Sequence, residues 1–163
     1  MSYEDYKPVE DFLQQYRFLN RRIQEYELEL LELKRKQENR ALDFLRPRVL
    51  DGTWVKANSD ADRVGEAVAM VIDVYAKRMM RISRKIKEIF KQLAQIEAIV
   101  DNAGLCDIEY CLIKQKFFEG DNMSFIAVDI GYSERGAREV KYRALKKIRQ
   151  EMVRKNILKR QYA

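Results

Sequence analysis

Side chains that can neutralise phosphate are concentrated in the last stretch of the sequence. Between Gly131 and Ala163 there are eleven lysines and arginines against three acidic residues, whereas Leu105 to Ile130 has two lysines and five acidic residues. Lysine and arginine bind DNA phosphates, and arginine also forms paired hydrogen bonds with guanine in the major groove. A charge run is usually only a solvated face, but this abrupt change from acidic to basic favours a nucleic-acid surface.

The basic stretch begins where the sequence predicts two helices joined by a tight turn. Residues 124–130 form the short first helix, Gly131 suits a left-handed turn position, and Ser133 caps a second helix that runs to Arg149. Ala127 is small at a point where two helices must meet closely. Apolar residues recur at spacings of three and four in the second helix: Ala137, Val140, Ala144 and Ile148. This pattern is typical of a helix-turn-helix, although other helical hairpins also contain small residues and a glycine.

Two long helices are expected ahead of this module. The first runs from Val9 to about Leu45, just before Pro47, and the second from Ser59 to Asn102. Apolar residues alternate four and three apart in both helices, as in a coiled-coil seam. They are Phe12, Tyr16, Leu19, Ile23, Tyr26, Leu30 and Leu33 in the first, and Val68, Ile72, Tyr75, Met79, Ile82, Ile86, Ile89, Leu93, Ile96 and Val100 in the second. An amphipathic bundle helix is the alternative, but the strict repeat favours a coiled coil.

The sequence therefore predicts an all-α protein with two parts. Residues 1–104 are expected to form a long antiparallel coiled-coil hairpin, and residues 105–163 a small helix-turn-helix domain with a basic tail. If Leu45 lies opposite Asp60, glutamates between residues 25 and 32 face basic residues between 77 and 81. Trp54, in the connector of the hairpin, is expected to cover its end.

The terminal domain should begin with one more helix, from Asp107 to Phe118. Its core is expected to contain nine apolar side chains: Ile108, Leu112, Phe117, Phe125, Ile126, Ile130, Val140, Leu145 and Ile148. A core drawn from fewer than about fifty residues is small, so we expect the hairpin to support it.

Composition argues against an enzyme or a metalloprotein. The chain has no histidine, which is the commonest general base and metal ligand, and only two cysteines, Cys106 and Cys111. Acidic residues that could be imagined as a metal site are scattered in the sequence: Asp43, Asp60, Asp62 and Asp73. Asp60 and Asp62 are better explained by the first turn of a helix. We expect no catalytic residue, no cofactor and no metal.

The sequence also lacks the signals for a membrane or an export pathway. It contains no run of about twenty apolar residues, and its start from Met1 to Asp5 is acidic without an apolar core. We therefore expect a cytoplasmic protein with no membrane partner and with both cysteines reduced.

Several motifs of the terminal domain resemble region four of bacterial sigma factors. They are Asp107–Ile113, Phe117–Gly120, Ile130–Ser133 and, most specifically, Arg143–Arg149. The order of hairpin and module, together with Leu19–Ile23, resembles the ArpU/RinA-type late transcription regulators of phages and prophages of Gram-positive bacteria. This resemblance implies a cytoplasmic regulator that acts on double-stranded promoter DNA in the bacterial host.

The resemblance assigns base and backbone contacts to the start of the second helix of the module. The DNA-binding residues expected from it are Ser133, Glu134, Arg135, Arg138, Glu139, Lys141, Tyr142, Arg143, Lys146 and Lys147. Arg135 and Arg138 are the candidates for guanine, and Glu134 or Glu139 could accept from cytosine N4. Two features depart from the sigma pattern: Glu134 precedes Arg135, and Gly136 stands where an arginine is usual.

The function expected from these features is sequence-specific regulation of transcription, as an activator of late genes. The hairpin would form a homodimer or contact the host RNA polymerase, and a basic tail from Arg154 to Arg160 would hold the DNA backbone. Two alternatives stay open. A terminase small subunit, which packages DNA, would suit the same architecture, and a coiled-coil adaptor would use the basic end only for solubility.

Overall fold

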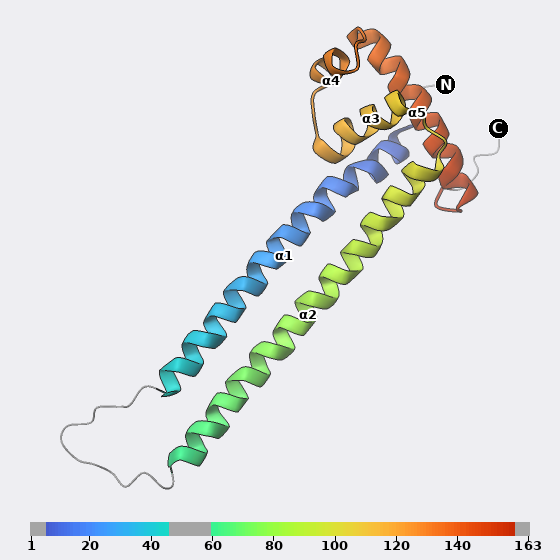
Figure 1. Ribbon diagram of the computed structural model, residues 1–163. Helices are drawn as coiled ribbons and strands as arrows, with labels where there is room; N and C mark the ends of the chain where they lie inside the picture. The colour runs from blue at the N-terminus through green and yellow to red at the C-terminus, as the bar shows by residue number, and fades with distance from the viewer. Residues whose placement is uncertain (1–5, 46–59, 159–163) are drawn as a thin grey trace. The chain divides into compact units, whose positions relative to one another are not determined.

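The computed structural model describes residues 6–45 and 60–158, and within these residues the chain is helical and contains no strand. Helices α1 (Lys7–Leu45) and α2 (Asp60–Asn102) are followed by α3 (Asp107–Ile113), a π-helical segment η2 (Lys114–Glu119), α4 (Met123–Asp129) and α5 (Glu134–Arg154) (Figure 1). The all-α prediction is confirmed. Trp54 and its connector lie outside the described residues.

The helices begin and end where local chemistry favours it. Pro8 lies in the first turn of α1, where its missing N–H costs nothing, and α1 ends ahead of Pro47, as expected. Gly104, Gly120 and Gly131 all have positive φ, of 67°, 89° and 72°. Each lies between two helices, in a left-handed conformation that glycine adopts without a steric clash from a Cβ atom.

The chain forms two compact units that both draw on α1 and α2. One unit combines Met1–Arg22 with Ile89–Ala163, and the other comprises Ile23–Glu88. The boundary predicted after residue 104 therefore lies within the first unit, because the opening turns of α1 and the last turns of α2 belong with the terminal helices.

In the Ile23–Glu88 unit, the two helical segments run in opposite directions. Gln37 Nε2 donates to the carbonyl of Ile72 at 3.3 Å, and the Lys85 ammonium lies 5.5 Å from the centre of the Tyr26 ring. The predicted register is wrong by about one helical turn, because it placed Gln37 opposite residue 68. Lys77 pairs with Asp73 on its own helix, with 2.8 Å between Nζ and Oδ2.

The seam predicted from the heptads is only partly buried in this unit. Ile23, Leu33 and Ile82 are buried, whereas Ile72 is 45% exposed. Large apolar side chains outside the seam are more exposed still: Leu28, Leu31, Leu42, Met70, Val74 and Met80. A pair of helices has only one shared face, so these side chains remain in contact with water.

The other unit has a dense core to which the beginning of the chain contributes. Val9 and Leu13 of α1 are fully buried. They share this core with side chains of the later helices: Ile96, Val100, Leu112, Ile113, Ile126, Ala127, Val140, Leu145, Ile148 and Met152. We expected the terminal helices to need support from outside residues 105–163, and the side chains that α1 and α2 contribute to this core agree with that expectation.

Two members of the predicted core are on the surface instead. Ile108 is 39% exposed and Phe125 is 62% exposed. On α3 the buried positions are Glu109, Leu112 and Ile113, so Leu112 is buried as predicted and Glu109 is buried in place of Ile108. The Glu109 carboxylate accepts from Lys147 Nζ and from the N–H of Cys106, partners that apolar periodicity does not reveal.

Tyr16 of α1 contacts two other helices of this unit. The Tyr16 ring stacks on Phe118 with 3.9 Å between ring centroids, and its hydroxyl donates to Glu97 Oε1 at 2.8 Å. Burial, followed by the hydrogen bond to the Glu97 carboxylate and its charge, raises the pKa of Tyr16 to about 12. One side chain of the predicted seam thus connects α1 to both α2 and η2.

Candidate nucleic-acid interface

The turn between α4 and α5 is fixed by backbone hydrogen bonds and small side chains. The N–H of Tyr132 donates to the carbonyl of Ala127 at 2.8 Å, and the N–H of Gly131 donates to that of Val128 at 3.1 Å. Ala127 and Ala137, one on each helix, are 2% and 0% exposed. Small side chains at these positions allow the two helices to approach closely, as predicted.

Helix α5 begins with the serine cap that the sequence predicted. The Ser133 hydroxyl accepts from the N–H of Gly136 at 3.2 Å, which satisfies one of the free donors of the first turn. A Cβ on Gly136 would lie 3.2 Å from Cδ1 of Tyr132 and 3.4 Å from the Ser133 hydroxyl. A side chain at this position would therefore require Tyr132 to shift slightly.

The first turns of α5 present four charged side chains to solvent. Arg135 is 93% exposed and its Nε lies 3.7 Å from Glu139 Oε1, while Arg138 is 63% exposed and its Nη2 lies 3.6 Å from Glu134 Oε2. Exposed pairs of this kind contribute little to stability, about 0–1 kcal/mol. Both arginines can therefore exchange their helix partner for a base or a phosphate at small cost.

The side chains of Lys141 and Tyr142 contact residues at the start of the described chain, Glu10 and Tyr6. Lys141 Nζ lies 3.0 Å from Glu10 Oε1, with side chains only 13% and 11% exposed. The Tyr142 ring lies 6.0 Å from that of Tyr6, and Lys141 Nζ is 5.3 Å from the centre of the Tyr142 ring. These two predicted DNA contacts hold the unit together in this structure, and no local feature of the sequence signals a partner so far away.

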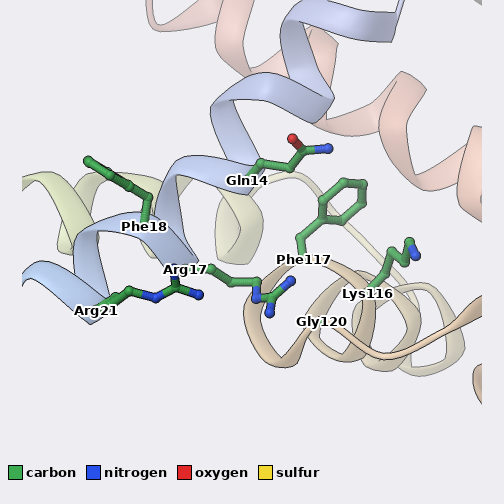
Figure 2. A pocket seen from close by; sticks show the side chains of 7 residues that line it. All are labelled: Gln14, Arg17, Phe18, Arg21, Lys116, Phe117 and Gly120. Carbon is green, nitrogen blue, oxygen red and sulfur yellow. The ribbon is translucent and has the colours of Figure 1, made fainter.

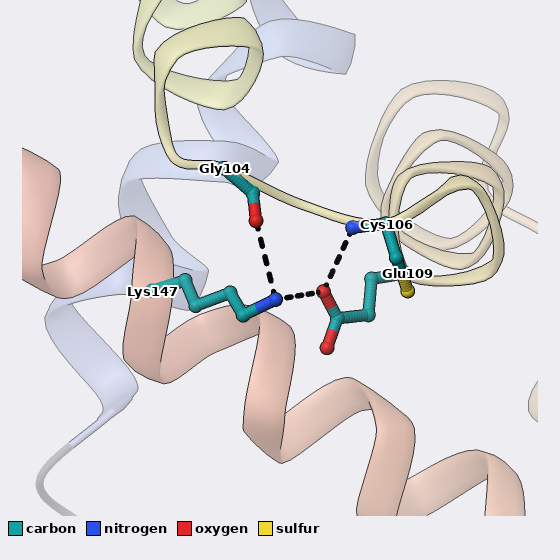
Figure 3. A network of polar contacts seen from close by, with 4 residues as sticks. All are labelled: Gly104, Cys106, Glu109 and Lys147. Atoms are coloured by element: carbon teal, nitrogen blue, oxygen red, sulfur yellow. Dashed lines mark hydrogen bonds and ion pairs between the residues drawn. The ribbon is translucent and has the colours of Figure 1, made fainter.

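Lys147 belongs to a polar network with the start of α3 (Figure 3). Its Nζ donates to Glu109 Oε2 at 2.7 Å and to the carbonyl of Gly104 at 3.2 Å, and the N–H of Cys106 donates to the same Glu109 oxygen at 3.0 Å. The Glu109 side chain is only 4% exposed. Burial alone would raise its pKa, but the Lys147 and Cys106 hydrogen bonds outweigh burial and lower the pKa of Glu109 below its usual value.

The remaining basic residues of α5 divide into free and paired cations. Arg143 and Lys146 are exposed and line a hollow of about 420 Å³ with Gln150, beside the Glu109–Lys147 pair. Neither forms a hydrogen bond or ion pair with any residue that the structure describes. Arg154, by contrast, pairs with Glu151, with 2.7 Å between Nε and Oε2. Of the rest of the predicted basic tail, Lys155 is exposed just after α5, and Lys159 and Arg160 lie outside the described residues.

Helix α4 and the turn after it expose an apolar surface that includes Phe125, which was predicted to lie in the core. Phe125 and Val128 are 62% and 81% exposed, and Tyr132, at the turn, is 41% exposed. These side chains are three and four residues apart, so they share one face of the helix and its end. The apolar periodicity of so short a helix does not distinguish an inner face from an outer one.

Other kinds of site find no support in the parts of the chain that the structure describes. No group of three or more histidine, cysteine, aspartate or glutamate side chains is placed to hold a metal ion in residues 6–45 and 60–158. Cys106 is exposed and Cys111 half-buried, and neither forms a disulfide. A search of the same residues finds no helix with the length and apolar character needed to cross a membrane. Comparison with protein-family models, with curated proteins and with solved structures finds no match to this chain.

Proposed function

We propose that α4, its turn and α5 form a helix-turn-helix that binds double-stranded DNA, with the N-terminal turns of α5 in the major groove. The observation that carries this proposal is the placement of Arg135 and Arg138. Both are exposed on the first turns of a capped helix, and the turn before that helix is fixed by hydrogen bonds. Recognition helices of this class contact base edges with their N-terminal residues.

Burial and pairing separate the predicted contacts into two roles. Arg135 and Arg138 are proposed to read bases, with Glu134 and Glu139 as acceptors for cytosine, and the free cations Arg143 and Lys146 are proposed to bind phosphates. Lys141, Tyr142 and Lys147 are proposed to position α5 through Glu10, Tyr6 and Glu109. This second group affects DNA binding through the shape of the domain.

We further propose that the long helices form an antiparallel coiled-coil hairpin that mediates assembly. The exposed apolar side chains Leu28, Leu31, Met70 and Val74 support a protein partner for the Ile23–Glu88 unit, because water solvates such a surface poorly. A second copy of the chain is the simplest partner, and the host RNA polymerase is the other partner suggested by the resemblance to phage late regulators. The whole protein would then activate late transcription in a bacterial cytoplasm.

The test is selection of bound fragments from the genome that encodes the protein, at two salt concentrations. Enrichment of one site upstream of late genes, with affinity that falls steeply in salt, supports the proposal. Enrichment at a packaging locus, together with a ring of many subunits, would indicate a terminase small subunit. Absence of binding at low salt would contradict DNA binding and indicate an adaptor.

A further inference from the structure

A second basic surface lies on the opening turns of α1, away in sequence from the arginines of α5. Four residues of α1 (Gln14, Arg17, Phe18 and Arg21) and three of the η2 region (Lys116, Phe117 and Gly120) line a pocket of about 420 Å³ (Figure 2). Both segments belong to the same compact unit. The volume is in the range of pockets that hold small ligands, and no acidic residue lines it.

Two exposed arginines of this pocket have no partner among the residues that the structure describes. Arg17 and Arg21 form no hydrogen bond or ion pair with any residue in the described part of the chain. They are four residues apart on one helix, where like charges face each other and oppose helix stability. Lys116 adds a third positive charge, although its Nζ donates to the carbonyl of Asp121 at 3.2 Å. An anion between the two arginines would relieve their repulsion.

The backbone opposite the arginines leaves space for one guanidinium. Figure 2 shows Arg17 reaching from α1 toward Gly120, the residue that ends η2 with φ of 89°. A Cβ at Gly120 would overlap the guanidinium carbon of Arg17. Gly120 is itself held by a hydrogen bond from its N–H to the carbonyl of Gln115 at 2.8 Å. The glycine therefore lets the Arg17 guanidinium lie against the end of η2.

We propose that this pocket binds a phosphoryl group, held by Arg17 and Arg21 within the positive field of Lys116. The planar guanidinium donates two parallel hydrogen bonds to phosphate oxygens, which a phosphodiester with one negative charge and a free phosphate with up to two both offer. The phosphoryl group has two sources with the same chemistry: a free phosphorylated compound, or a backbone phosphate of DNA. The proposal does not depend on base recognition by α5.

The first arm of the experiment titrates the full-length protein with inorganic phosphate and pyrophosphate while the Nε–H signals of its arginines are followed by NMR. We expect the signals of Arg17 and Arg21, assigned from single variants, to shift and saturate, and acetate at equal ionic strength to leave them in place. The R17Q/R21Q variant should weaken pyrophosphate binding about tenfold or more. The K36Q/R40Q variant is the matched control, because it removes two exposed cations four residues apart on the same helix.

The second arm measures affinity for a DNA duplex at several salt concentrations. If a backbone phosphate occupies the pocket, R17Q/R21Q should bind DNA more weakly and reduce the salt dependence by about two contacts, unlike K36Q/R40Q. If a free compound is the ligand, the first arm is positive and DNA affinity stays unchanged. The proposal would be overturned if a folded R17Q/R21Q protein kept both its phosphate binding and its DNA binding unchanged. Equal shifts of the two arginine signals with acetate would also overturn it.

Discussion

Lys141 Nζ lies 3.0 Å from Glu10 Oε1, and the ion pair joins residues that are 131 positions apart in the sequence. Both side chains are nearly buried, so removal of one charge leaves the other without an adequate solvent shell. This pair, together with Val9 and Leu13 in the core, makes the beginning of α1 a structural part of the unit that contains α5.

The Glu10–Lys141 pair should be measurable as a coupling energy. We expect E10Q and K141M each to lower the free energy of unfolding by about 1–3 kcal/mol. In the double variant, the loss should be smaller than the sum of the two single losses by at least about 0.5 kcal/mol. Urea unfolding followed by circular dichroism gives these values, with D11N as an exposed control. Strict additivity would contradict a direct interaction in solution.

The Glu109–Lys147 contact should make stability depend on pH in the acid range. Because the pKa of Glu109 is lowered in the folded protein, its contribution is present above the unfolded value of about 4.3 and is lost as pH falls through the folded value. At pH 7 we expect E109Q to cost about 1–3 kcal/mol. Between pH 5 and pH 3 the difference from the original protein should shrink.

The control for this experiment is E119Q, which removes one charge from an exposed position of η2. Its effect at pH 7 should stay within about 0.5 kcal/mol. A difference between E109Q and the original protein that is the same at pH 7 and pH 3 would show that Glu109 is not ionised in the way its contacts indicate.

The proposed base readers and the proposed phosphate binders on α5 should differ in how their loss affects DNA binding. We expect R138A to cost about 1–3 kcal/mol on the preferred site and to relax specificity at one base pair. K146A should instead weaken binding on all sequences alike and reduce the salt slope by about one. The measurement is a set of binding curves on the preferred duplex and its single-base variants.

A third variant tests the structural role assigned to Lys141. K141M should leave the salt slope of DNA binding unchanged at temperatures where the protein is folded, because its charge is already paired with Glu10. A reduced slope for K141M would place this lysine at the DNA after all.

The glycines at two positions with open surroundings should respond in opposite directions to alanine. A Cβ at Gly131 or at Gly65 meets no atom within 4 Å, but Gly131 has φ of +72° and Gly65 lies within α2. We expect G131A to destabilise by about 1 kcal/mol through backbone strain, and G65A to stabilise by about 0.5–1 kcal/mol. Thermal unfolding of both variants tests this contrast, and a stabilised G131A would contradict the left-handed turn.

Features that depend on neighbouring residues were predictable from the sequence. The Ser133 cap, the left-handed Gly131 and the end of α1 at Leu45 follow from capping, turn and proline rules, and all three were predicted. Features that depend on distant partners were not. Phe125 was expected in the core and is 62% exposed, whereas Val9 and Leu13, from a helix assigned to another domain, are fully buried.

The functional residues show the same division between local and distant signals. Exposure of Arg135 and Arg138 follows from the helix period and their charge. The pairing of Lys141 with Glu10 and of Lys147 with Glu109 requires the folded chain, because a lysine on a basic helix looks the same in sequence whether it meets DNA or a buried carboxylate. Arg17 and Arg21 share a pocket with Lys116 and Phe117 of η2, so this site too requires the folded chain.

The long separation between Glu10 and Lys141 also affects how the protein is made. Val9, Glu10 and Leu13 leave the ribosome more than a hundred residues before α5. Their native neighbours on α5 do not exist until then, so this part of the fold cannot be completed during early synthesis. A nascent chain that stops before α5 carries both long helices but lacks the helix that completes this core, and its apolar opening turn is left for chaperones or proteases to recognise.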